Sequence, residues 1–317
     1  MAVIGQDIEQ AKKLLNHGEV VGIPTETVYG LAGNALNEKA ILKIYEVKNR
    51  PKFDPLIAHT NSLDKVEKLV KHIPDQAAIL AENFWPGPLT LLLDKVDSVP
   101  DLLTSGHPRV AVRIPNHPLT LELLSAIDFP LAAPSANPFG YVSPVTAEHV
   151  EAQLGERIEY ILDGGPCQVG LESTIIGFED DSAVVYRLGG IPVEEIRKLI
   201  GEVQVKVNVS SDPAAPGMLK SHYSPGIQLT IGNISQELKS RDPKSTGIIS
   251  FSQTYPVPEE HTFVLSHAGD LNEAARNIFK ALRKMDNPAI SHVLAEFVPD
   301  EGLGKAINDR LRRASAV

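Results

Sequence analysis

The chain has 317 residues, of which 43% are hydrophobic and 22% charged, as is usual for a globular protein. At about 150 residues per domain, this length predicts two domains or one large one, with enough apolar surface to fold without disulfides. Cys167 is the single cysteine, which excludes an internal disulfide and favours a reducing, cytoplasmic compartment. The first residues do not resemble a signal peptide, and no apolar run approaches the ~20 residues that span a bilayer.

The net charge is −10, and it is unevenly distributed. From Ile227 onward, 11 Lys and Arg balance 11 Asp and Glu, which leaves 19 basic against 29 acidic residues in 1–226. Proteins that coat nucleic acid usually carry the opposite sign, so any RNA contact is expected to be local and weak. The few cations within the motifs of the first region therefore stand out.

Residues 1–207 alternate strand-like and helix-like segments, a pattern that predicts an α/β fold with a mixed sheet. Asn37 is a suitable N-cap for the helix that follows it. The predicted strands cover residues 19–24, 55–59, 89–94, 109–114, 130–133, 158–162, 173–178 and 183–188. The predicted helices cover residues 8–15, 40–47, 75–84, 117–126, 146–154 and 192–200.

Residues 208–226 differ in composition from both flanking regions, because they hold three prolines and two glycines. They also carry Met218, Leu219 and Tyr223, side chains that prefer to dock on a surface. We expect a linker that packs on the first domain and acts as a lid. Residues 227–317 predict a smaller α/β domain, with strands at 227–231, 246–251, 262–265 and 292–296 and helices at 270–285 and 304–314.

Common catalytic and nucleotide signatures are absent. The sequence has neither a phosphate-binding loop of the form G-x-x-x-x-G-K-[ST] nor a G-x-G-x-x-G dinucleotide turn. No Cys/His group has zinc spacing, and no G-x-S-x-G nucleophile elbow occurs. The chemistry must therefore come from other polar residues.

Polar residues cluster where predicted strands end, the edge of an α/β sheet at which ligands bind. The segment PTETVYGL at 24–31 places two hydroxyls and a carboxylate at such a strand end. Taken by itself, it favours a polar turn with Gly30 at a special backbone angle. The segment KNRPKFDPLIAH at 48–59 gathers three cations. Lysine as a point charge and arginine as a fork suit a triphosphate, although a solvated helix end also attracts cations.

Two arginines interrupt apolar strands, Arg113 in RVAVRIP and Arg187 in YRLGGI. A buried guanidinium needs a fixed acid or an anionic ligand, and the sequence leaves both open. Ser135 in APSANP and Ser173 in LESTII place hydroxyls beside predicted strands. Small residues there permit close approach of a ligand, but they also suit an ordinary turn.

As an ordered set, PTETVYGL, KNRPKFDPLIAH, RVAVRIP, APSANP, LESTII and YRLGGI resemble the YrdC family. PAAPGMLKSHYSP and AINDRLRRAS resemble segments of its longer, two-domain members. The resemblance implies a twisted mixed α/β sheet around an electropositive cavity, followed by a smaller Rossmann-like domain. The implied activity joins L-threonine, bicarbonate and ATP into threonylcarbamoyl-AMP and pyrophosphate, with Mg²⁺ accompanying ATP. A separate transferase then passes the threonylcarbamoyl group to tRNA.

The resemblance also implies roles for residues, position by position along the motifs. It assigns no metal ligand. At four positions this chain departs from the family pattern, with Asp54 in place of a common asparagine, Arg109 and Ala133 in place of hydroxyl residues, and Ala215 in place of serine. L-threonine contacts fall on Thr27, His59, Arg113, Ala133 and Ser173. ATP contacts fall on Arg50, Asp54, Arg109, Ser135, Ser143, Arg187, Ala215 and Tyr223, and stabilisation of charge in the reaction falls on Lys48 and Arg50.

Other functions remain open from the sequence. A basic concavity on this fold could hold RNA without catalysis, and the same pocket could act as a nucleotide sensor without turnover. The acidic net charge weighs against the first of these. A carbamoyl transferase of hydrogenase maturation shares the domain type, but one cysteine cannot supply the zinc modules of such chains.

Overall fold

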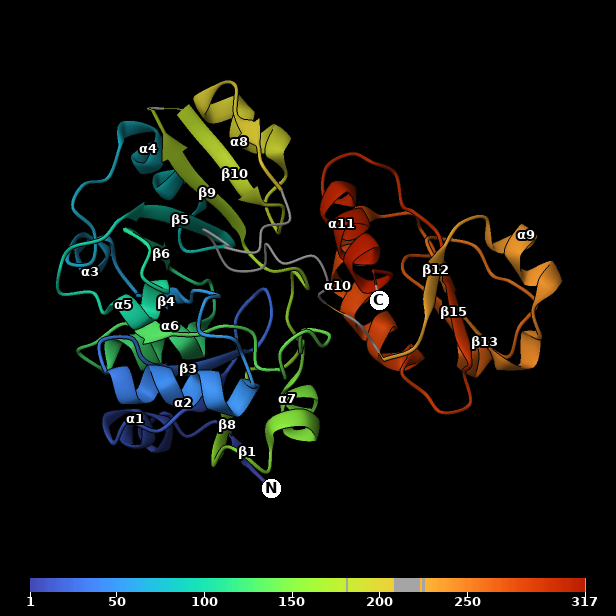
Figure 1. Cartoon of the computed structure of the whole chain (residues 1–317), viewed down its shortest axis with the longest axis horizontal. Helices are drawn as coiled ribbons and strands as arrows, with labels where there is room; N and C mark the ends of the chain where they lie inside the picture. Colours follow the sequence, from blue (N-terminus) through green and yellow to red (C-terminus); the bar gives the residue numbers. More distant parts are fainter. Residues whose placement is uncertain (181, 208–222, 224–225, 317) are drawn as a thin grey trace.

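The computed structural model describes residues 1–180, 182–207, 223 and 226–316, which form two α/β units lying side by side (Figure 1). The larger unit is built on an 11-stranded sheet in the order β1-β8-β2-β3-β7-β4-β6-β5-β9-β10-β11, with both parallel and antiparallel pairs. The smaller unit has a four-stranded parallel sheet in the order β12-β15-β13-β14. These sheets confirm the predicted mixed α/β fold with a smaller Rossmann-like second unit.

The larger unit contains eight helices among its described residues. Its strands are β1 (Val3–Gly5), β2 (Val21–Ile23), β3 (Gly30–Asn34), β4 (Ile57–His59), β5 (Leu89–Asp94), β6 (Arg109–Arg113), β7 (Leu131–Ala132), β8 (Tyr160–Leu162), β9 (Thr174–Glu179), β10 (Ser182–Arg187) and β11 (Gln204–Val205). Its helices are α1 (Ile8–Asn16), α2 (Glu38–Lys48), α3 (Leu63–Glu67), α4 (Asp75–Phe84), α5 (Asp101–Thr104), α6 (Pro118–Ser125), α7 (Ala147–Leu154) and α8 (Val193–Ile200).

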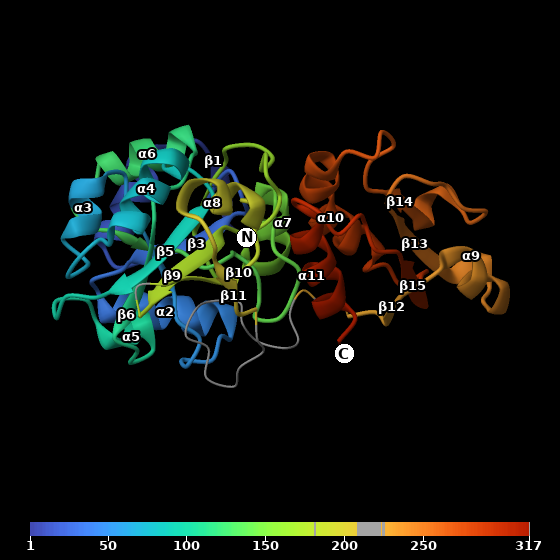
Figure 2. The ribbon, with the colours of Figure 1, turned by 90° about the horizontal axis from the view of Figure 1, so that it is seen from above.

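The smaller unit places two long helices between its sheet and the larger unit. Its strands are β12 (Leu229–Ile231), β13 (Thr246–Ser250), β14 (Thr262–Val264) and β15 (His292–Ala295), and its helices are α9 (Ile234–Glu237), α10 (Leu271–Met285) and α11 (Gly304–Ala314). Short 3₁₀ turns lie at Leu238–Ser240, Pro243–Ser245 and Glu259–His261. Figures 1 and 2 show α10 and α11 facing the larger unit, with α9 on the opposite side of the sheet.

Helix α2 shows how local sequence places a site residue. The Asn37 side chain accepts from the backbone N–H of Lys39 at 3.0 Å and caps the helix, as predicted. Asn49 adopts the left-handed conformation with φ 52° and ends the helix. The chain therefore turns after the helix, and the Arg50 guanidinium that follows donates to the backbone carbonyls of Asp54 and Pro55.

Every strand and helix predicted for the larger unit is present within a few residues, but strands β1, β3 and β11 and helices α3 and α5 were not predicted. Gly30 was expected in a turn at a special backbone angle, whereas it begins strand β3 with no positive φ. Its strand has the composition Gly-Leu-Ala-Gly-Asn, which lacks β-branched residues. A Cβ at Gly30 would lie 3.1 Å from the Cβ of Ala133, so close strand packing explains the glycine better than a turn does.

The two units pack directly on each other. Gly170 has φ 76°, and a Cβ there would lie 2.4 Å from the Cα of Arg276 in α10, so backbone approaches backbone at the seam. Arg283 of α10 donates to the carbonyl of Ser143 at 3.2 Å and to the Gln153 side chain at 2.9 Å. Most of the predicted linker and lid, with Ala215, Met218 and Leu219, lies outside the described residues.

No helix in the described part of the chain is long and apolar enough to cross a membrane.

Candidate active site

A pocket opens in the larger unit where several strands of its sheet end. It encloses about 520 Å³ of atom-free space, part of it open to solvent. Nine of the fourteen residues predicted for the site line it. The lining residues are Thr27, Val28, Arg50, Pro55, Leu56, Ile57, His59, Arg113, Ala133, Pro134, Ser135, Glu172, Ser173, Arg187 and Tyr223.

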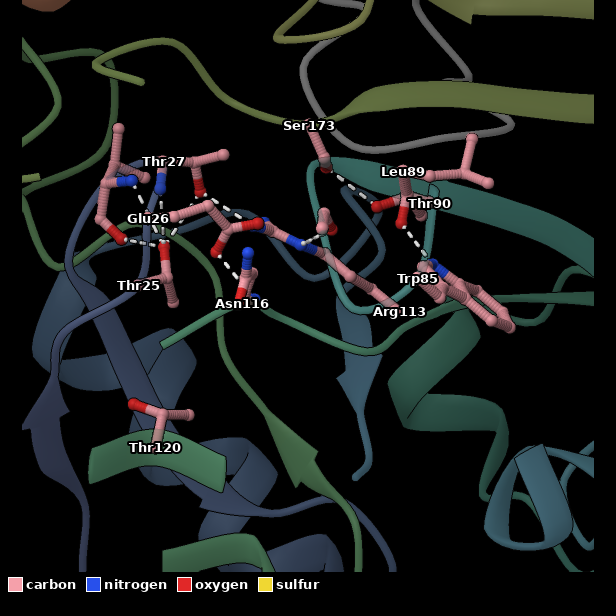
Figure 3. Close-up of polar contacts among 12 residues, drawn as sticks. Thr25, Glu26, Thr27, Trp85, Leu89, Thr90, Arg113, Asn116, Thr120 and Ser173 are labelled. Atoms are coloured by element: carbon pink, nitrogen blue, oxygen red, sulfur yellow. Dashed lines mark hydrogen bonds and ion pairs between the residues drawn. The ribbon is translucent and has the colours of Figure 1, made fainter. Parts of the chain in front are cut away.

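One wall of the pocket is organised by Arg113 at the end of β6. Its guanidinium forms an ion pair with Glu26 at 2.7 Å and donates to the Thr27 hydroxyl at 3.0 Å and the Gly87 carbonyl at 3.2 Å. Figure 3 shows Arg113 extended toward the Thr25–Thr27 loop, with Asn116 beside Glu26. The backbone N–H of Asn116 donates to Glu26 at 3.0 Å. This network fixes the guanidinium so that it can hold an anion such as an amino-acid carboxylate.

His59 lies beside Arg113, because β4 and β6 pair in a register that places the two residues together. Burial, and then the charge of Arg113, lower the pKa of His59 from 6.5 to about 3. Its Nδ1 lies 3.1 Å from the Ile57 carbonyl and, in the neutral ring, donates to it. His59 is therefore neutral at physiological pH and can offer a hydrogen bond but no charge to a ligand.

A second wall of the pocket is organised by Arg187 at the end of β10. Its Nε donates to the Ser173 carbonyl at 3.0 Å and its Nη2 to the Ser173 hydroxyl at 2.9 Å. That hydroxyl also lies 2.7 Å from the Thr90 hydroxyl, as Figure 3 shows. Burial lowers the pKa of Arg187 to about 10, which still leaves the guanidinium charged at neutral pH.

Glu172 is the acidic residue of the lining. It accepts from the Ser143 hydroxyl at 2.7 Å and from Arg310 of α11 at 3.0 Å. Burial alone would raise the pKa of Glu172, but the charges of Arg310 and Arg187 and the Ser143 hydroxyl outweigh it and hold the pKa at about 2. The carboxylate therefore stays ionised and neutralises part of the positive charge of this wall.

Arg50 forms a third cationic group. It pairs with the buried carboxylate of Asp54 at 2.8 Å and donates to the backbone carbonyls of Asp54 and Pro55 at 3.0 and 2.9 Å. The loop after α2 thus folds around the guanidinium that it presents. The sequence motifs predicted that Lys48, Arg50, Arg113 and Arg187 share one pocket; the three arginines line it and Lys48 does not.

Four predicted site residues are described but do not line the pocket: Lys48, Asp54, Arg109 and Ser143. Burial lowers the pKa of Lys48, and its Nζ donates to the carbonyls of Ser135 and Asn137, each at 2.5 Å. Lys48 therefore supports the Ser135 loop from behind. Asp54 pairs with Arg50 and Ser143 with Glu172, so both act on residues that line the pocket.

Arg109 lies at the start of β6, at the strand end opposite Arg113. Its Nη1 donates to the Tyr186 hydroxyl at 3.1 Å, and its guanidinium lies 5.3 Å from the centre of that ring. Both contacts are made away from the pocket. The geometry gives Arg109 a packing role at this sheet edge.

The sequence alone did not single out Glu26, Thr90, Glu172 and Arg310. Glu26 and Glu172 stand inside the quoted motifs, and the need of Arg113 and Arg187 for an acid was the available signal. Arg310 gave no such signal, because it follows Glu172 by 138 positions. Among the described residues, no group of three or more His, Cys, Asp or Glu side chains could hold a metal ion.

Two family models match this chain. Residues 13–189 match a family model described as Telomere recombination and named for Sua5, YciO and YrdC. Residues 191–316 match the model described as Threonylcarbamoyl-AMP synthase, C-terminal domain.

Individual relatives align with almost the whole chain. The threonylcarbamoyl-AMP synthase of Pyrococcus abyssi is 42% identical, covering 97% of this chain and 94% of that protein. The threonylcarbamoyl-AMP synthase of Bacillus subtilis is 39% identical, covering 97% and 92%. The crystal structure of P. abyssi Sua5 complexed with L-threonine matches with a TM-score of 0.91 and 39% identity, covering 99% of this chain and 97% of that one. The chain therefore belongs to the Sua5/YrdC family, in its two-domain form.

Proposed function

We propose that this chain is an L-threonylcarbamoyladenylate synthase, which converts L-threonine, bicarbonate and ATP into threonylcarbamoyl-AMP and pyrophosphate. The main supporting observation is the convergence of Arg50, Arg113 and Arg187 on one pocket. Relatives of that name align with nearly the whole chain. An amino-acid carboxylate and a triphosphate together supply the anions that three guanidinium groups would bind.

The two walls of the pocket suit the two larger substrates. Arg113 would pair with the carboxylate of threonine, while Thr27, neutral His59 and the Ser173 hydroxyl orient its amine and side chain. Arg187 and Arg50 would face the phosphates of ATP, with Ser135 on the loop that Lys48 supports. The two substrates would then meet between the walls, with the threonine amine directed toward the nucleotide.

The reaction would proceed in two steps. The threonine nitrogen first forms a bond to the carbon of CO₂ derived from bicarbonate, and the amine loses a proton to give a carbamate. A carbamate oxygen then attacks the α-phosphorus of ATP, and the bond to pyrophosphate breaks with its electron pair leaving on pyrophosphate. Catalysis of this kind rests on positioning and on stabilisation of negative charge, which fits a pocket of fixed guanidinium groups.

Mg²⁺ would enter with ATP, whose phosphate charge it neutralises. Arg187 and Arg50 form the nucleotide wall of the pocket, and the acids that accompany them, Glu172 and Asp54, are already paired with Arg310 and Arg50. The described residues therefore fit an ion held by the nucleotide better than a resident metal site. We further propose that the product passes to a separate transferase acting on tRNA in the cytoplasm, with only weak tRNA contact by this chain.

The direct test mixes the protein with ATP, Mg²⁺, bicarbonate and isotopically labelled L-threonine, and seeks threonylcarbamoyl-AMP by mass. Reactions without threonine or without bicarbonate serve as controls. Product that requires all three substrates supports the proposal. ATP binding without product or pyrophosphate would instead indicate a nucleotide sensor, and salt-sensitive tRNA binding without turnover would indicate an RNA-binding module.

A further inference from the structure

Arg310 reaches from the smaller unit into the wall of the pocket. It lies on α11 and is 0% exposed. Its Nε donates to the Glu172 carboxylate at 3.0 Å and its Nη2 to the Leu188 carbonyl at 2.8 Å. Its Nη1 donates to Asp309 at 2.7 Å. One side chain of the smaller unit thus directly contacts the acidic residue of the pocket lining.

The same guanidinium packs on a second lining residue, Tyr223. It lies 5.2 Å from the centre of the Tyr223 ring, on which Phe279 of α10 also stacks at 5.3 Å with an interplanar angle of 27°. Tyr223 is 1% exposed. Side chains from both long helices of the smaller unit therefore hold this part of the pocket wall.

Glu172 connects these contacts to the nucleotide wall. The charged and titratable groups that face it are Arg310 from α11, Arg187 from β10 and the Tyr223 hydroxyl. Its other oxygen is held by Ser143. Arg187 donates to the carbonyl and the hydroxyl of Ser173, the residue that follows Glu172 in the chain. A shift of Glu172 on loss of Arg310 is therefore transmitted to Arg187 through Ser173.

Packing between the two units does not by itself explain why the Arg310–Glu172 ion pair is buried. The Lys305–Glu194 pair at the same seam keeps its side chains 34% and 39% exposed, as an ordinary surface contact does. A fully buried pair loses solvation, and that loss can exceed the attraction between the charges. Its position beside the pocket, held by hydrogen bonds on both partners, indicates a role in the site.

We propose that Arg310 is a positioning residue of the active site, supplied by the smaller unit, which fixes Glu172 and Tyr223 and through Glu172 the Arg187 guanidinium. This inference rests on the proposed function. The threonine wall, built on Arg113 and Glu26, is complete within the larger unit. The nucleotide wall becomes complete only when the smaller unit is docked.

The experiment uses the full chain and five variants: Arg310→Met, Arg310→Lys, Glu172→Gln, the Arg310→Met/Glu172→Gln double variant, and Arg312→Met. The last is the matched control, because Arg312 lies on the same helix with its guanidinium 4.8 Å from the centre of the exposed Phe297 ring. Pyrophosphate release that depends on threonine and bicarbonate is measured against pH and ATP concentration. Circular dichroism and the Tm report folding.

Arg310→Met should lower kcat/KM for ATP about 100-fold, the size of effect that a small misplacement of a catalytic group produces. The KM for threonine should change less, because Arg187 reaches the threonine wall only through the Ser173 hydroxyl. Without Arg310, burial raises the pKa of Glu172, so activity should fail at a higher pH on the acid side. Arg310→Lys should recover part of the loss. Arg312→Met should follow the wild type.

Because Arg310 acts through Glu172, the double variant should lose no more than the worse single variant. Additive losses, an equal loss at every pH, or an Arg310→Met variant as active as Arg312→Met would each overturn the inference. If Arg310→Met does not fold, wild-type ATP kinetics in the nearly isosteric Glu172→Gln variant would overturn it instead. If the wild type shows no turnover, the proposed function is wrong, but the role of Arg310 can still be tested. Calorimetry then compares the ATP affinity of Arg310→Met with that of Arg312→Met, and equal affinities would overturn the inference.

Discussion

Two buried arginine–glutamate pairs flank the pocket, and they are built in different ways. Arg113 and Glu26 lie 2.7 Å apart, and both belong to the larger unit. Arg310 and Glu172 lie 3.0 Å apart, and they join the two units. In each pair the carboxylate is held by a further hydrogen bond, from the Asn116 backbone or from the Ser143 hydroxyl.

The comparison separates two ways of fixing a charge beside a ligand. The Arg113 wall depends on strand ends within a single sheet, so it forms when the larger unit folds. The nucleotide wall depends on side chains of α10 and α11, so its geometry also depends on how the two units pack. Variants of the two walls should therefore differ in which substrate they affect and in which pH range they lose stability.

Arg113→Met should have the largest effect. It removes the proposed partner of the threonine carboxylate and leaves Glu26 buried without its cation. Loss of one partner of a buried pair costs about 4 kcal/mol, which corresponds to a fall of about 10³-fold in kcat/KM for threonine. The free energy of unfolding should fall by about 3–5 kcal/mol, measured by denaturant titration.

The Glu26→Gln/Arg113→Met double variant is the control, because it removes the stranded charge. It should regain much of the stability and none of the turnover. Recovery of both would show that Arg113 serves the fold and not the substrate.

His59 should make the threonine wall sensitive to mild acid. The folded chain holds a pKa of about 3 for His59 against an ordinary value of 6.5. Between these values the unfolded chain binds more protons, so the free energy of unfolding falls as the pH drops from 6.5 toward 3. A shift of this size corresponds to a loss on the order of 4–5 kcal/mol.

The measurement compares denaturant unfolding of the wild type with that of His59→Asn, whose amide can still donate to the Ile57 carbonyl. The difference between the two curves isolates His59 from other buried histidines. Parallel curves between pH 6.5 and 4 would contradict the assigned protonation of His59.

Glu172 should make the free energy of unfolding depend on pH in a lower range than His59 does. Its folded pKa is about 2, below its ordinary value of 4.5. The stabilisation is therefore complete above about pH 4.5 and is lost as the pH falls toward 2. The wild type should lose about 3 kcal/mol across this range relative to Glu172→Gln, and Arg310→Met should abolish most of that difference. If Arg310→Met loses as much stability as the wild type over this pH range, the low pKa of Glu172 does not depend on the smaller unit.

Sequence reasoning succeeded where the signal is local. Periodic apolar segments predicted most strands of the large sheet, but not β1, β3 and β11. Strand β3 was missed because its Gly-Leu-Ala-Gly-Asn composition carries no strand signal. The motifs placed Arg50, Arg113 and Arg187 together, because polar residues at neighbouring strand ends share one edge of the sheet. The sequence left open whether Arg113 meets a fixed acid or a ligand; the structure supplies Glu26 and still exposes Arg113 to the pocket.

Partners that are distant in the chain could not be read from spacing. Arg310 and Glu172 meet only because the two units dock. Lys48 follows the same motif as Arg50, yet it points to the carbonyls of Ser135 and Asn137 behind the lining. Lys48 is the last residue of α2, whereas Arg50 follows the left-handed Asn49 that ends the helix. Composition does not reveal which of the two cations reaches the pocket.

Phe279→Leu should have a moderate effect on the nucleotide wall. It removes the ring that stacks on Tyr223 but keeps an apolar side chain in α10. Loss of an aromatic pair costs about 1 kcal/mol, so the KM for ATP should rise about five-fold with kcat unchanged. Phe263→Leu in β14 is the matched control, because its ring packs on Lys284 within the smaller unit. Equal KM values for ATP in the two variants would show that Phe279 does not support the nucleotide wall.

Arg109→Met should have the smallest effect, and it tests an ATP contact implied by family resemblance against the observed geometry. The Arg109 guanidinium bonds to the Tyr186 hydroxyl and packs on its ring, at the end of β6 opposite Arg113. Removal of a partly exposed contact of this kind costs about 0–1 kcal/mol of stability. Pyrophosphate release should stay within about two-fold of the wild type, because kinetic effects follow lost substrate contacts. A ten-fold or larger rise in the KM for ATP at an unchanged Tm would instead assign Arg109 to the nucleotide, and the nucleotide wall would then extend beyond the pocket described between Arg50 and Arg187.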